Sequence, residues 1–411
     1  MGQILVAGGG ASGLMAAVAA ARQGAKVTLL EKNKQTGRKL LVTGNGHCNF
    51  TNRNQEQGKY RSSSPAFVER ALKAFGWEDT VAFFEELGIP ARDRDGYLYP
   101  ASGQAASVAD ALRLEAGRLK VKMSCNTEIL SVEYRDGRFL ARTGGWEYEG
   151  GALILACGSP AAPETGASGD GYRFAESLGH TLEAPLPALT GVYAAEKDCG
   201  KLAGVRQEAR AVLLVDGQIC AEETGEVQFT SYGLSGIPIF QISRYVSRAL
   251  EQKKTCEICL DLWSGRGSGR MRAVFEKNRQ YTKDRIGPGA LLGIFPEKLS
   301  RVLLERAGIS LAKKRGDWTR AEEERLTALI GTFRFTVTRC RGYEQAQVCT
   351  GGVPLAELKG ITMESDRTPG LYLAGELLDV DGACGGYNLQ WAWTSGYLAG
   401  RAAAERVVSL C

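Results

Sequence analysis

The N-terminal segment carries the feature that most restricts how this chain can fold. An apolar strand at 3–7 runs into the loop 8–13, Gly-Gly-Gly-Ala-Ser-Gly, which contains G-x-G-x-x-G and opens an alanine-rich helix. A second apolar strand begins at Val27 and ends at Glu31, about twenty residues beyond the loop, as dinucleotide-binding units require. This β-α-β order predicts a Rossmann-type fold that holds a dinucleotide by its pyrophosphate.

Each part of this unit has a physical task. Gly8 permits the tight turn, Gly10 lets the pyrophosphate approach the backbone, and Gly13 lets helix and sheet pack closely. The helix N-terminus offers N–H groups and partial positive charge to the phosphates, and Glu31 can accept hydrogen bonds from ribose hydroxyls. The loop by itself does not decide between FAD and NAD. The cofactor contacts predicted here are Gly8, Gly10, Ala11, Ser12, Gly13, Glu31 and Lys32.

The order of the remaining elements predicts an α/β protein in which both ends of the chain build one domain. The 411 residues suffice for two or three domains. We expect a cofactor domain from 1–190 and 345–411, a β-rich, barrel-like substrate domain from 191–262 and 328–344, and a small helical domain from 263–327. Helices are predicted near 65–75, 78–87, 104–116 and 388–407, and strands near 119–124, 127–134, 138–143, 153–157, 332–340 and 370–374.

Local signals support three of these assignments. Ser64-Pro65 is typical of a helix start, with serine as N-cap and proline in the first turn. Thr319 and Glu322 have the spacing of a capping box, next to Trp318. Cys256 and Cys259 form a C-x-x-C, but they lie in an alternating, strand-like stretch. Strand positions three apart point to opposite faces, so a redox pair is disfavoured there.

Composition excludes several classes of protein. The N-terminus leads directly into a strand without a charged leader, and no apolar run approaches the ~20 residues of a membrane helix. We therefore expect a cytoplasmic protein whose eleven cysteines are mostly free thiols. With two histidines and no second C-x-x-C, no metal site is expected. A net charge of +5 on this length does not imply nucleic acid.

Longer motifs make the chain recognisable. The glycine- and asparagine-rich loop 37–52 and the C-terminal segment 372–396 closely resemble the BaiN/YhiN-type flavoproteins, also called aminoacetone-oxidase-like, and 229–236 and 362–365 also match this family. The resemblance spans nearly the whole chain. It implies FAD and a flavin domain of the two-dinucleotide-binding type, interrupted by an inserted β-rich region and a helical region.

The resemblance also implies the flavin end of the site. Glu376 would bond the ribityl chain, and Gly385 and Gly386 would pack on the ring. The N-terminus of the last helix would stabilise the negative charge that reduction leaves at flavin N1 and O2. The implied contacts are Arg38, Lys39, Thr43, Gly44, Asn45, Gly46, Asn49, Ile129, Cys157, Gly158, Gly375, Glu376, Asp379, Gly382, Gly385, Gly386, Tyr387, Asn388, Leu389 and Gln390.

The family implies a reductase of enones, such as 3-oxo-Δ4 or Δ4,6 bile acids and steroids, in which flavin N5 delivers the hydride. Tyr387, His47 and Tyr232 are the candidate proton donors, and His47 stands where family members generally carry arginine. Only one G-x-G-x-x-G follows a strand, so a separate nicotinamide domain is not expected. NAD(P)H, as the expected donor, would enter the substrate's own cavity.

Two other functions stay open at this stage. An amine oxidase would take hydride from a small amino-ketone such as aminoacetone and pass the electrons to oxygen. A flavin-bound module could instead bind RNA through the basic stretch Arg266–Arg285, although such a run is usually a solvated face. The oligomeric state is left open.

Overall fold

The chain folds into two compact units. The structure, a computed structural model, describes residues 2–56, 58–263 and 268–409. One unit comprises Met1–Leu186 and Gln347–Cys411, and the other comprises Pro187–Ala346. The β-rich and helical regions that the sequence separates therefore fall within one compact unit.

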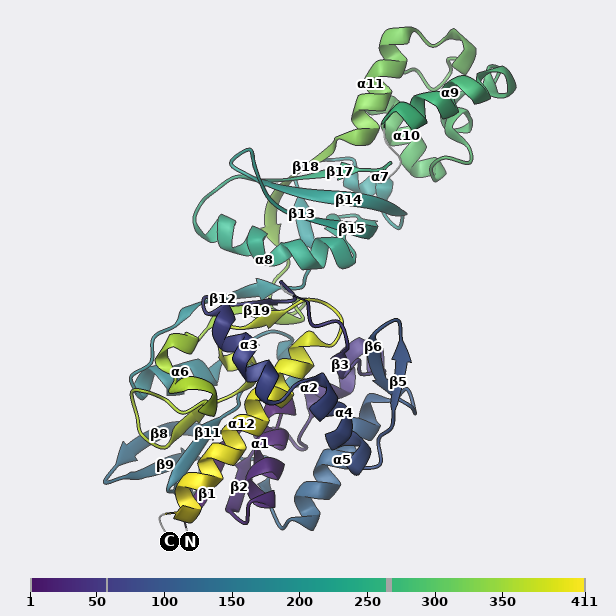
Figure 1. Ribbon diagram of the computed structural model, residues 1–411. Coiled ribbons are helices and arrows are strands. Elements are labelled where there is room, and N and C mark those ends of the chain that lie inside the picture. The colour runs from purple at the N-terminus through teal and green to yellow at the C-terminus, as the bar shows by residue number, and fades with distance from the viewer. Residues whose placement is uncertain (1, 57, 264–267, 410–411) are drawn as a thin grey trace. The chain divides into compact units, whose positions relative to one another are not determined.

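A five-stranded parallel sheet forms the centre of the first unit (Figure 1). The order of its strands is β20 (Leu371–Leu373), β11 (Ala152–Leu155), β1 (Gln3–Ala7), β2 (Lys26–Leu30) and β7 (Lys122–Ser124). Strand β1 pairs with β2 on one side and with β11 on the other, so the loop after β1 emerges at the middle of the sheet. Ligands of such sheets bind beyond the carboxyl ends of the strands.

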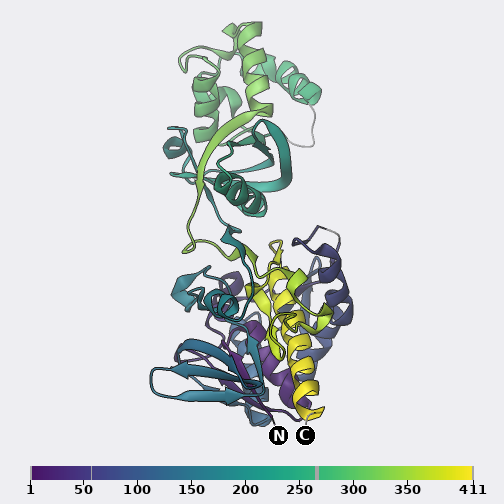
Figure 2. The same ribbon diagram turned by 90° about the vertical axis from the view of Figure 1, so that its left-hand side faces the viewer.

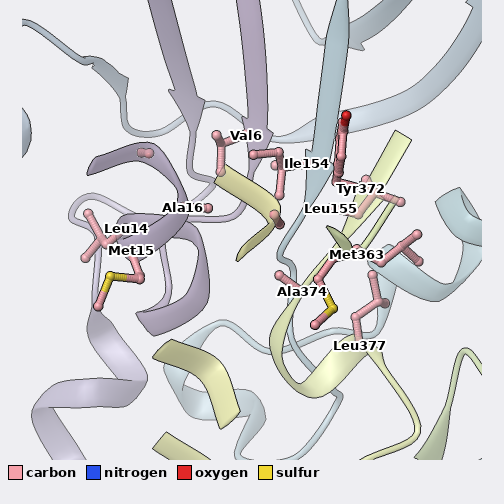
Figure 3. Packing of buried hydrophobic residues seen from close by; sticks show 14 of the residues in the cluster. Val6, Leu14, Met15, Ala16, Ile154, Leu155, Met363, Tyr372, Ala374 and Leu377 are labelled. Atoms are coloured by element: carbon pink, nitrogen blue, oxygen red, sulfur yellow. The ribbon is translucent and has the colours of Figure 1, made fainter. Parts of the chain in front are cut away.

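The strands of this sheet are apolar because both faces are covered. Val6 of β1, Ile154 of β11 and Tyr372 of β20 lie side by side in the core (Figure 3). The N-terminal β-α-β unit and the C-terminal strand thus share one hydrophobic core, which confirms the predicted flavin-type α/β fold.

Helix α1 (Ala11–Arg22) packs against the C-terminal helix α12 (Tyr387–Ser409) at very short range. A Cβ at Gly396 would lie 2.4 Å from the Ser12 carbonyl oxygen, and one at Gly400 would lie 2.3 Å from that of Ala16. Only glycine permits this approach, so the small residues on α12 place its N-terminal half beside the loop after β1.

Smaller sheets and helices complete the first unit. An antiparallel sheet that packs against β1 and β11 contains β8 (Ile129–Arg135), β9 (Arg138–Thr143) and β10 (Glu147–Gly150). The other sheets pair β3 (Thr51–Asn52) with β6 (Tyr97–Pro100), β6 with β5 (Ala91–Arg94), β4 (Tyr60–Arg61) with β21 (Asp381–Gly382), and β12 (Glu183–Ala188) with β19 (Val348–Gly352). The helices are α2 (Arg38–Val42), α3 (Pro65–Ala74), α4 (Trp77–Glu86), α5 (Ala105–Arg118) and α6 (Asp170–Ser177).

The second unit is built on a closed six-stranded β-barrel, which confirms the predicted barrel-like region (Figures 1 and 2). Their order is β13 (Val192–Ala194), β16 (Gly233–Ser235), β15 (Gln218–Thr230), β14 (Arg206–Val215), β17 (Cys256–Asp261) and β18 (Phe333–Cys340). Helix α8 (Ile237–Glu251) packs on the barrel strands. The other helices are α7 (Cys199–Leu202), α9 (Ser268–Thr282), α10 (Glu297–Arg306) and α11 (Arg320–Gly331).

The local predictions have mixed outcomes. The capping box exists: the Glu322 carboxylate accepts from the Thr319 N–H at 2.7 Å, and the Thr319 hydroxyl accepts from the Glu322 N–H at 3.3 Å. Helix α3 starts as predicted, with Ser64 as its N-cap and Pro65 in its first turn, although the Ser64 side chain forms no capping hydrogen bond. Cys256 and Cys259 are free thiols on β17.

The described residues contain neither a candidate membrane span nor a candidate metal cluster. None of their helices is long and apolar enough to cross a membrane. Within residues 2–56, 58–263 and 268–409, no group of three His, Cys, Asp or Glu side chains is placed to hold a metal ion.

Candidate functional site

The loop after β1 has two glycines that the fold requires and one that it leaves open. Gly8 has a φ of +100°, and a Cβ there would lie 2.6 Å from the Ala156 carbonyl oxygen. A Cβ on Gly13 would lie 1.9 Å from the Gly8 carbonyl oxygen. Around Gly10, by contrast, no described protein atom lies within 4 Å of such a Cβ. Gly10 therefore faces space that a pyrophosphate could occupy, next to the N–H groups of Ala11 and Ser12 at the start of α1.

Glu31 lies at the end of β2, directly beneath this loop. Its Oε2 accepts a hydrogen bond from the Gly9 N–H at 2.8 Å, and its Oε1 accepts from the Asn33 N–H at 2.8 Å. These bonds fix the carboxylate in a buried position. Oε1 also accepts from Asn33 Nδ2 at 2.6 Å, so Oε2 is the oxygen that retains a further lone pair for a ribose hydroxyl.

Two predicted cations, Lys32 and Arg38, connect the end of β2 to the segment 163–170. Lys32 Nζ lies 3.2 Å from Asp170 Oδ2, and Arg38 Nη2 donates to the Glu164 carbonyl at 2.7 Å. Burial raises the pKa of Asp170, but hydrogen bonds from Ser168 and Lys32 outweigh it and bring the pKa below its usual value. Both cations therefore hold the loop 163–170, which follows β11, in position.

A third cation meets the C-terminal segment. Lys39 Nζ lies 2.7 Å from Glu376 Oε2, and the Ser159 hydroxyl donates to the same oxygen at 2.7 Å. Glu376 opens the short helix Gly375–Leu377, which follows β20. Gly375 is required there because a Cβ would lie 2.4 Å from the Ser12 hydroxyl of α1. The sequence predicts Lys39 and Glu376 but misses Ser159, whose position after the strand and Gly158 is the signal that could have found it.

The segment 43–49 turns sharply through left-handed backbone. Gly44, Asn45, Gly46 and Cys48 all have positive φ, and the turn is closed by a 3.1 Å hydrogen bond from the Cys48 N–H to the Thr43 carbonyl. Cys48 is buried, which raises the pKa of its thiol to about 12. The thiol is therefore protonated at neutral pH and has no nucleophilic role.

One atom of this segment points to a missing partner. Asn49 Oδ1 is buried and has no hydrogen-bond donor in the described structure. A buried acceptor without a donor is costly, typically by about 1–3 kcal/mol. This orphaned oxygen, the open space at Gly10 and the Lys39–Glu376 pair fit a bound flavin dinucleotide.

The loop before α12 packs onto this segment. Gly386 has a φ of +92°, and a Cβ there would lie 2.8 Å from Asn49 Oδ1. At Gly385, with φ +116°, a Cβ would lie 2.6 Å from the Tyr97 ring, and Asn52 Nδ2 donates to the Gly385 carbonyl at 2.9 Å. The two motifs on which the resemblance rests are thus brought together, and Asn52 and Tyr97 are site residues that the predicted contacts did not include.

Tyr387, the first residue of α12, is buried beside this loop. Its ring lies edge-on to Tyr60, with centroids 5.6 Å apart. Burial, followed by the nearby Tyr97 phenol, raises the pKa of Tyr387 to about 12. The phenol therefore stays neutral over the physiological range, as a proton donor must.

Other predicted contacts use their side chains within the protein. Asn388 bonds the backbone of Gly382, and Gln390 is fully buried and accepts from the Thr51 hydroxyl at 2.5 Å. Asp379 Oδ2 accepts from the Ser63 hydroxyl at 2.8 Å. The side chains of these three residues hold the loop in place. A contact between them and a cofactor would therefore have to come from their backbone.

The remaining predicted positions flank the sheet edge. Ile129 is buried in β8, and Cys157 follows β11 with its thiol 3.4 Å from the Ala7 carbonyl oxygen. Burial raises the pKa of Cys157 to about 12. Gly158 has a φ of +74° and no described atom near its Cβ position.

The three candidate proton donors differ in burial and in the unit to which they belong. Tyr387 is buried in the first unit. His47 is exposed in the same unit, with Nδ1 2.9 Å from the Gly103 carbonyl oxygen. Tyr232 belongs to the barrel unit, in the turn between β15 and β16. Of the three, Tyr387 alone is buried, and it directly follows the loop glycines 385 and 386.

Comparison with known proteins gives matches along the whole chain. Residues 2–402 match the family described as HI0933-like protein Rossmann domain. A 3-dehydro-bile acid delta(4,6)-reductase of Clostridium scindens is 42% identical over 408 residues, which cover 99% of this chain and 100% of that protein. A ribosomal RNA dihydrouridine synthase of Haemophilus influenzae is 30% identical over 401 residues, 96% of each chain. Among solved structures, the open conformation of a flavocytochrome c3 fumarate reductase has a TM-score of 0.49 and 17% identity, covering 99% of this chain and 78% of that one.

Proposed function

The chain belongs to the HI0933-like Rossmann family, and from this premise we propose that it reduces a carbon–carbon double bond conjugated to a carbonyl group in a 3-oxo-Δ4 or Δ4,6 bile acid or steroid. It is an FAD-dependent oxidoreductase. The observation that carries the proposal is the 42% identity, over 99% of this chain, to a protein named as a bile acid delta(4,6)-reductase.

The second relative supports the same bond type. Dihydrouridine forms when the C5–C6 double bond of uracil is saturated, and that bond is conjugated to the C4 carbonyl. Both relatives are therefore named for saturating an alkene next to a carbonyl. We infer that members of the family share this type of reaction but act on different substrates.

The chain's own residues would hold FAD at four places. The loop 8–13 would receive the pyrophosphate, and Glu31 the ribose. Lys39 and Glu376 would contact the ribityl region, and Asn49 with the loop 385–387 would border the ring. Bound FAD supplies a hydride from N5. What the protein adds is orientation, exclusion of water and a proton.

Tyr387 is the proposed source of that proton. Hydride addition to the β-carbon of an enone leaves an enolate, which needs a proton at the α-carbon or oxygen. A phenol that burial keeps neutral can donate it, and such general-acid assistance typically contributes about 10²–10⁴-fold. His47 and Tyr232 are the alternatives that substitution must separate from it.

NAD(P)H is the proposed electron donor. The chain has one strand-linked G-x-G-x-x-G. Its other glycine-rich stretch, Thr165–Gly171, runs from a short 3-10 helix into the first turn of α6 and so does not follow a strand. We propose that donor and acceptor use one cavity in turn, which predicts ping-pong kinetics.

The decisive experiment separates the two half-reactions. The purified holoenzyme is reduced under anaerobic conditions, and 3-oxo-Δ4 and 3-oxo-Δ4,6 bile acids and steroids are added while flavin absorbance is followed. We expect rapid reoxidation and a saturated product, with the corresponding saturated ketone as the inactive control. Failure of every such enone to reoxidise the flavin would refute the proposal. Peroxide formation with aminoacetone and oxygen would favour an amine oxidase.

A second candidate, reduction of uridine in ribosomal RNA, is favoured by the 30% identity to a ribosomal RNA dihydrouridine synthase over 96% of this chain. The basic stretch noted in the sequence falls partly on 264–267, outside the described residues, and otherwise on α9 and the residues after it. Incubating the reduced enzyme with protein-free ribosomal RNA and measuring dihydrouridine by mass spectrometry tests this candidate. A product from RNA and none from enones would replace the steroid proposal.

A further inference from the structure

The barrel unit carries a cluster of two arginines and two tyrosines, of which Tyr232 alone enters the proposed reaction, as an alternative proton donor. The Arg339 guanidinium carbon lies 4.0 Å from the ring centroid of Tyr193, and that of Arg341 lies 4.8 Å from the ring centroid of Tyr232. The two tyrosine rings are themselves 5.1 Å apart. The four side chains, here called the Arg–Tyr cluster, form one continuous stack.

The backbone of three barrel strands fixes this cluster. Tyr193 of β13 pairs directly with Arg339 of β18, and also with Gly233 of β16. The Arg341 N–H donates to the Gly191 carbonyl at 2.9 Å. A Cβ on Gly191 would lie 3.0 Å from the Tyr232 hydroxyl, so a larger residue would push the phenol away. The arrangement is therefore built into the barrel.

Neither arginine of the cluster has an acidic partner. Within the described ranges, no carboxylate lies within 4.0 Å of the Arg339 or Arg341 guanidinium group. Other barrel arginines are paired across neighbouring strands: Arg206 with Glu226 and Arg210 with Glu222. The stack thus presents two uncompensated positive charges on a protein whose surface arginines are commonly paired.

Stacking leaves the chemistry of the cluster available to a ligand. A guanidinium that lies over an aromatic ring uses its face, while its N–H donors remain free along the edge. Those donors suit the two oxygens of one carboxylate. The Tyr232 hydroxyl, 3.5 Å from Arg341 Nη1, adds a further donor, and the half-buried tyrosine rings offer apolar surface.

We infer that the Arg–Tyr cluster binds the carboxylate of an amphipathic acid with an apolar ring system, such as the side-chain carboxylate of a bile acid. This inference rests on the proposed function and specifies its substrate as acidic. The compact cluster suits one anionic group, whereas RNA binding draws its affinity from many phosphate contacts spread along a groove. The cluster would select acidic over neutral steroids.

The test uses binding without turnover. A saturated 3-oxo bile acid, which has no alkene to reduce, and its methyl ester are titrated into the holoenzyme by isothermal calorimetry. We expect wild type to bind the acid about tenfold to a hundredfold more tightly than the ester, as a charged hydrogen-bonded pair allows. Arg339→Gln and Arg341→Gln should bind acid and ester alike. Arg210→Gln, whose arginine is paired with Glu222, is the matched control and should keep the preference.

Several outcomes would overturn the inference. These are equal binding of acid and ester by wild type, no binding of either, or a preference that survives in both cluster variants. Failure of the proposed reduction is distinguishable from these. If wild type prefers the acid but no enone reoxidises the flavin, the cluster stands and the reaction is wrong.

Discussion

Lys39 and Glu376, which are 337 positions apart in the sequence, meet with Nζ 2.7 Å from Oε2. This contact joins helix α2, which follows β2, to the segment after β20, the last strand of the parallel sheet. Both side chains are partly buried, at 28% and 19% exposure, so solvent screens their attraction only in part. The pair marks the point where the two ends of the chain close on the cofactor site.

Replacing Lys39 by methionine should weaken FAD binding more than folding. The Glu376 carboxylate would keep only the Ser159 hydroxyl as a partner and would swing away from the ribityl region. We expect an affinity loss of about tenfold, measured by flavin fluorescence during equilibrium dialysis. Lys314→Met, at an exposed pair with Asp284, is the control. Unchanged FAD affinity in Lys39→Met would remove the pair from the site.

Gly10 and Gly13 should respond differently to alanine. Gly10→Ala adds a methyl group to open space and should leave the apo-protein's melting temperature unchanged, while FAD affinity falls by about tenfold or more. Gly13→Ala would place a Cβ 1.9 Å from the Gly8 carbonyl oxygen and should prevent normal folding. Thermal melts with and without FAD separate the two effects. A Gly10→Ala protein that binds FAD normally would show that the pyrophosphate lies elsewhere.

Tyr387→Phe should slow product formation by about 10²-fold or more while FAD remains bound. Since burial raises the pKa of Tyr387 to about 12, the wild-type phenol should act as a donor throughout the physiological pH range and fail only as the pH approaches that value. Stopped-flow measurement of enone-dependent flavin reoxidation, from neutral to alkaline pH, checks this. Tyr281→Phe, at an exposed tyrosine, is the control. A larger loss in His47→Asn or Tyr232→Phe would transfer the role to that residue.

A buried network around Glu357 predicts how stability depends on pH. Its carboxylate oxygens accept from His180 Nδ1 at 2.8 Å and from the Thr181 hydroxyl at 2.7 Å. Burial is the largest influence and raises the pKa of Glu357, but the hydrogen bonds from Thr181, His180 and Arg367 together bring it below the usual value. A carboxyl with a lowered folded-state pKa stabilises the protein above its unfolded-state pKa. That stability is lost as the pH falls through the folded-state pKa.

Glu357→Gln should therefore destabilise the protein at pH 7, by roughly 1–3 kcal/mol, because buried hydrogen bonds to a charged acceptor are weakened. Its stability should also change less than that of wild type as the pH falls below the ordinary glutamate pKa, because the variant has no carboxylate there to protonate. Denaturant unfolding of both proteins at several pH values measures this. Glu69→Gln, at an exposed position on α3, should change neither quantity. Parallel pH curves for Glu357→Gln and wild type would contradict the assignment.

Most of the secondary structure followed from local sequence signals. The strand at 3–7, the turn at 8–13 and the capping box at Thr319 are set by residues close together in the chain. Their period, glycine content and cap spacing act over one or two turns of backbone, which is why pattern alone predicts them. Ser64 is the N-cap of α3 as predicted, but its side chain makes no capping hydrogen bond, because a residue type permits such a bond without fixing the rotamer that makes it.

The sequence by itself determined the β-α-β unit, the glycine positions and, through its motifs, the family. The tertiary structure decided which side chains those motifs bring together. Lys39 and Ser159 both meet Glu376. Among the described residues, Asn49 has a buried oxygen without a donor, and Arg339 and Arg341 lie over tyrosine rings without an acidic partner. The physical reason is the distance along the chain between the residues that interact. Turns and caps are local, whereas these contacts depend on strand pairing and on the close packing of α1 with α12, which join residues far apart in the chain.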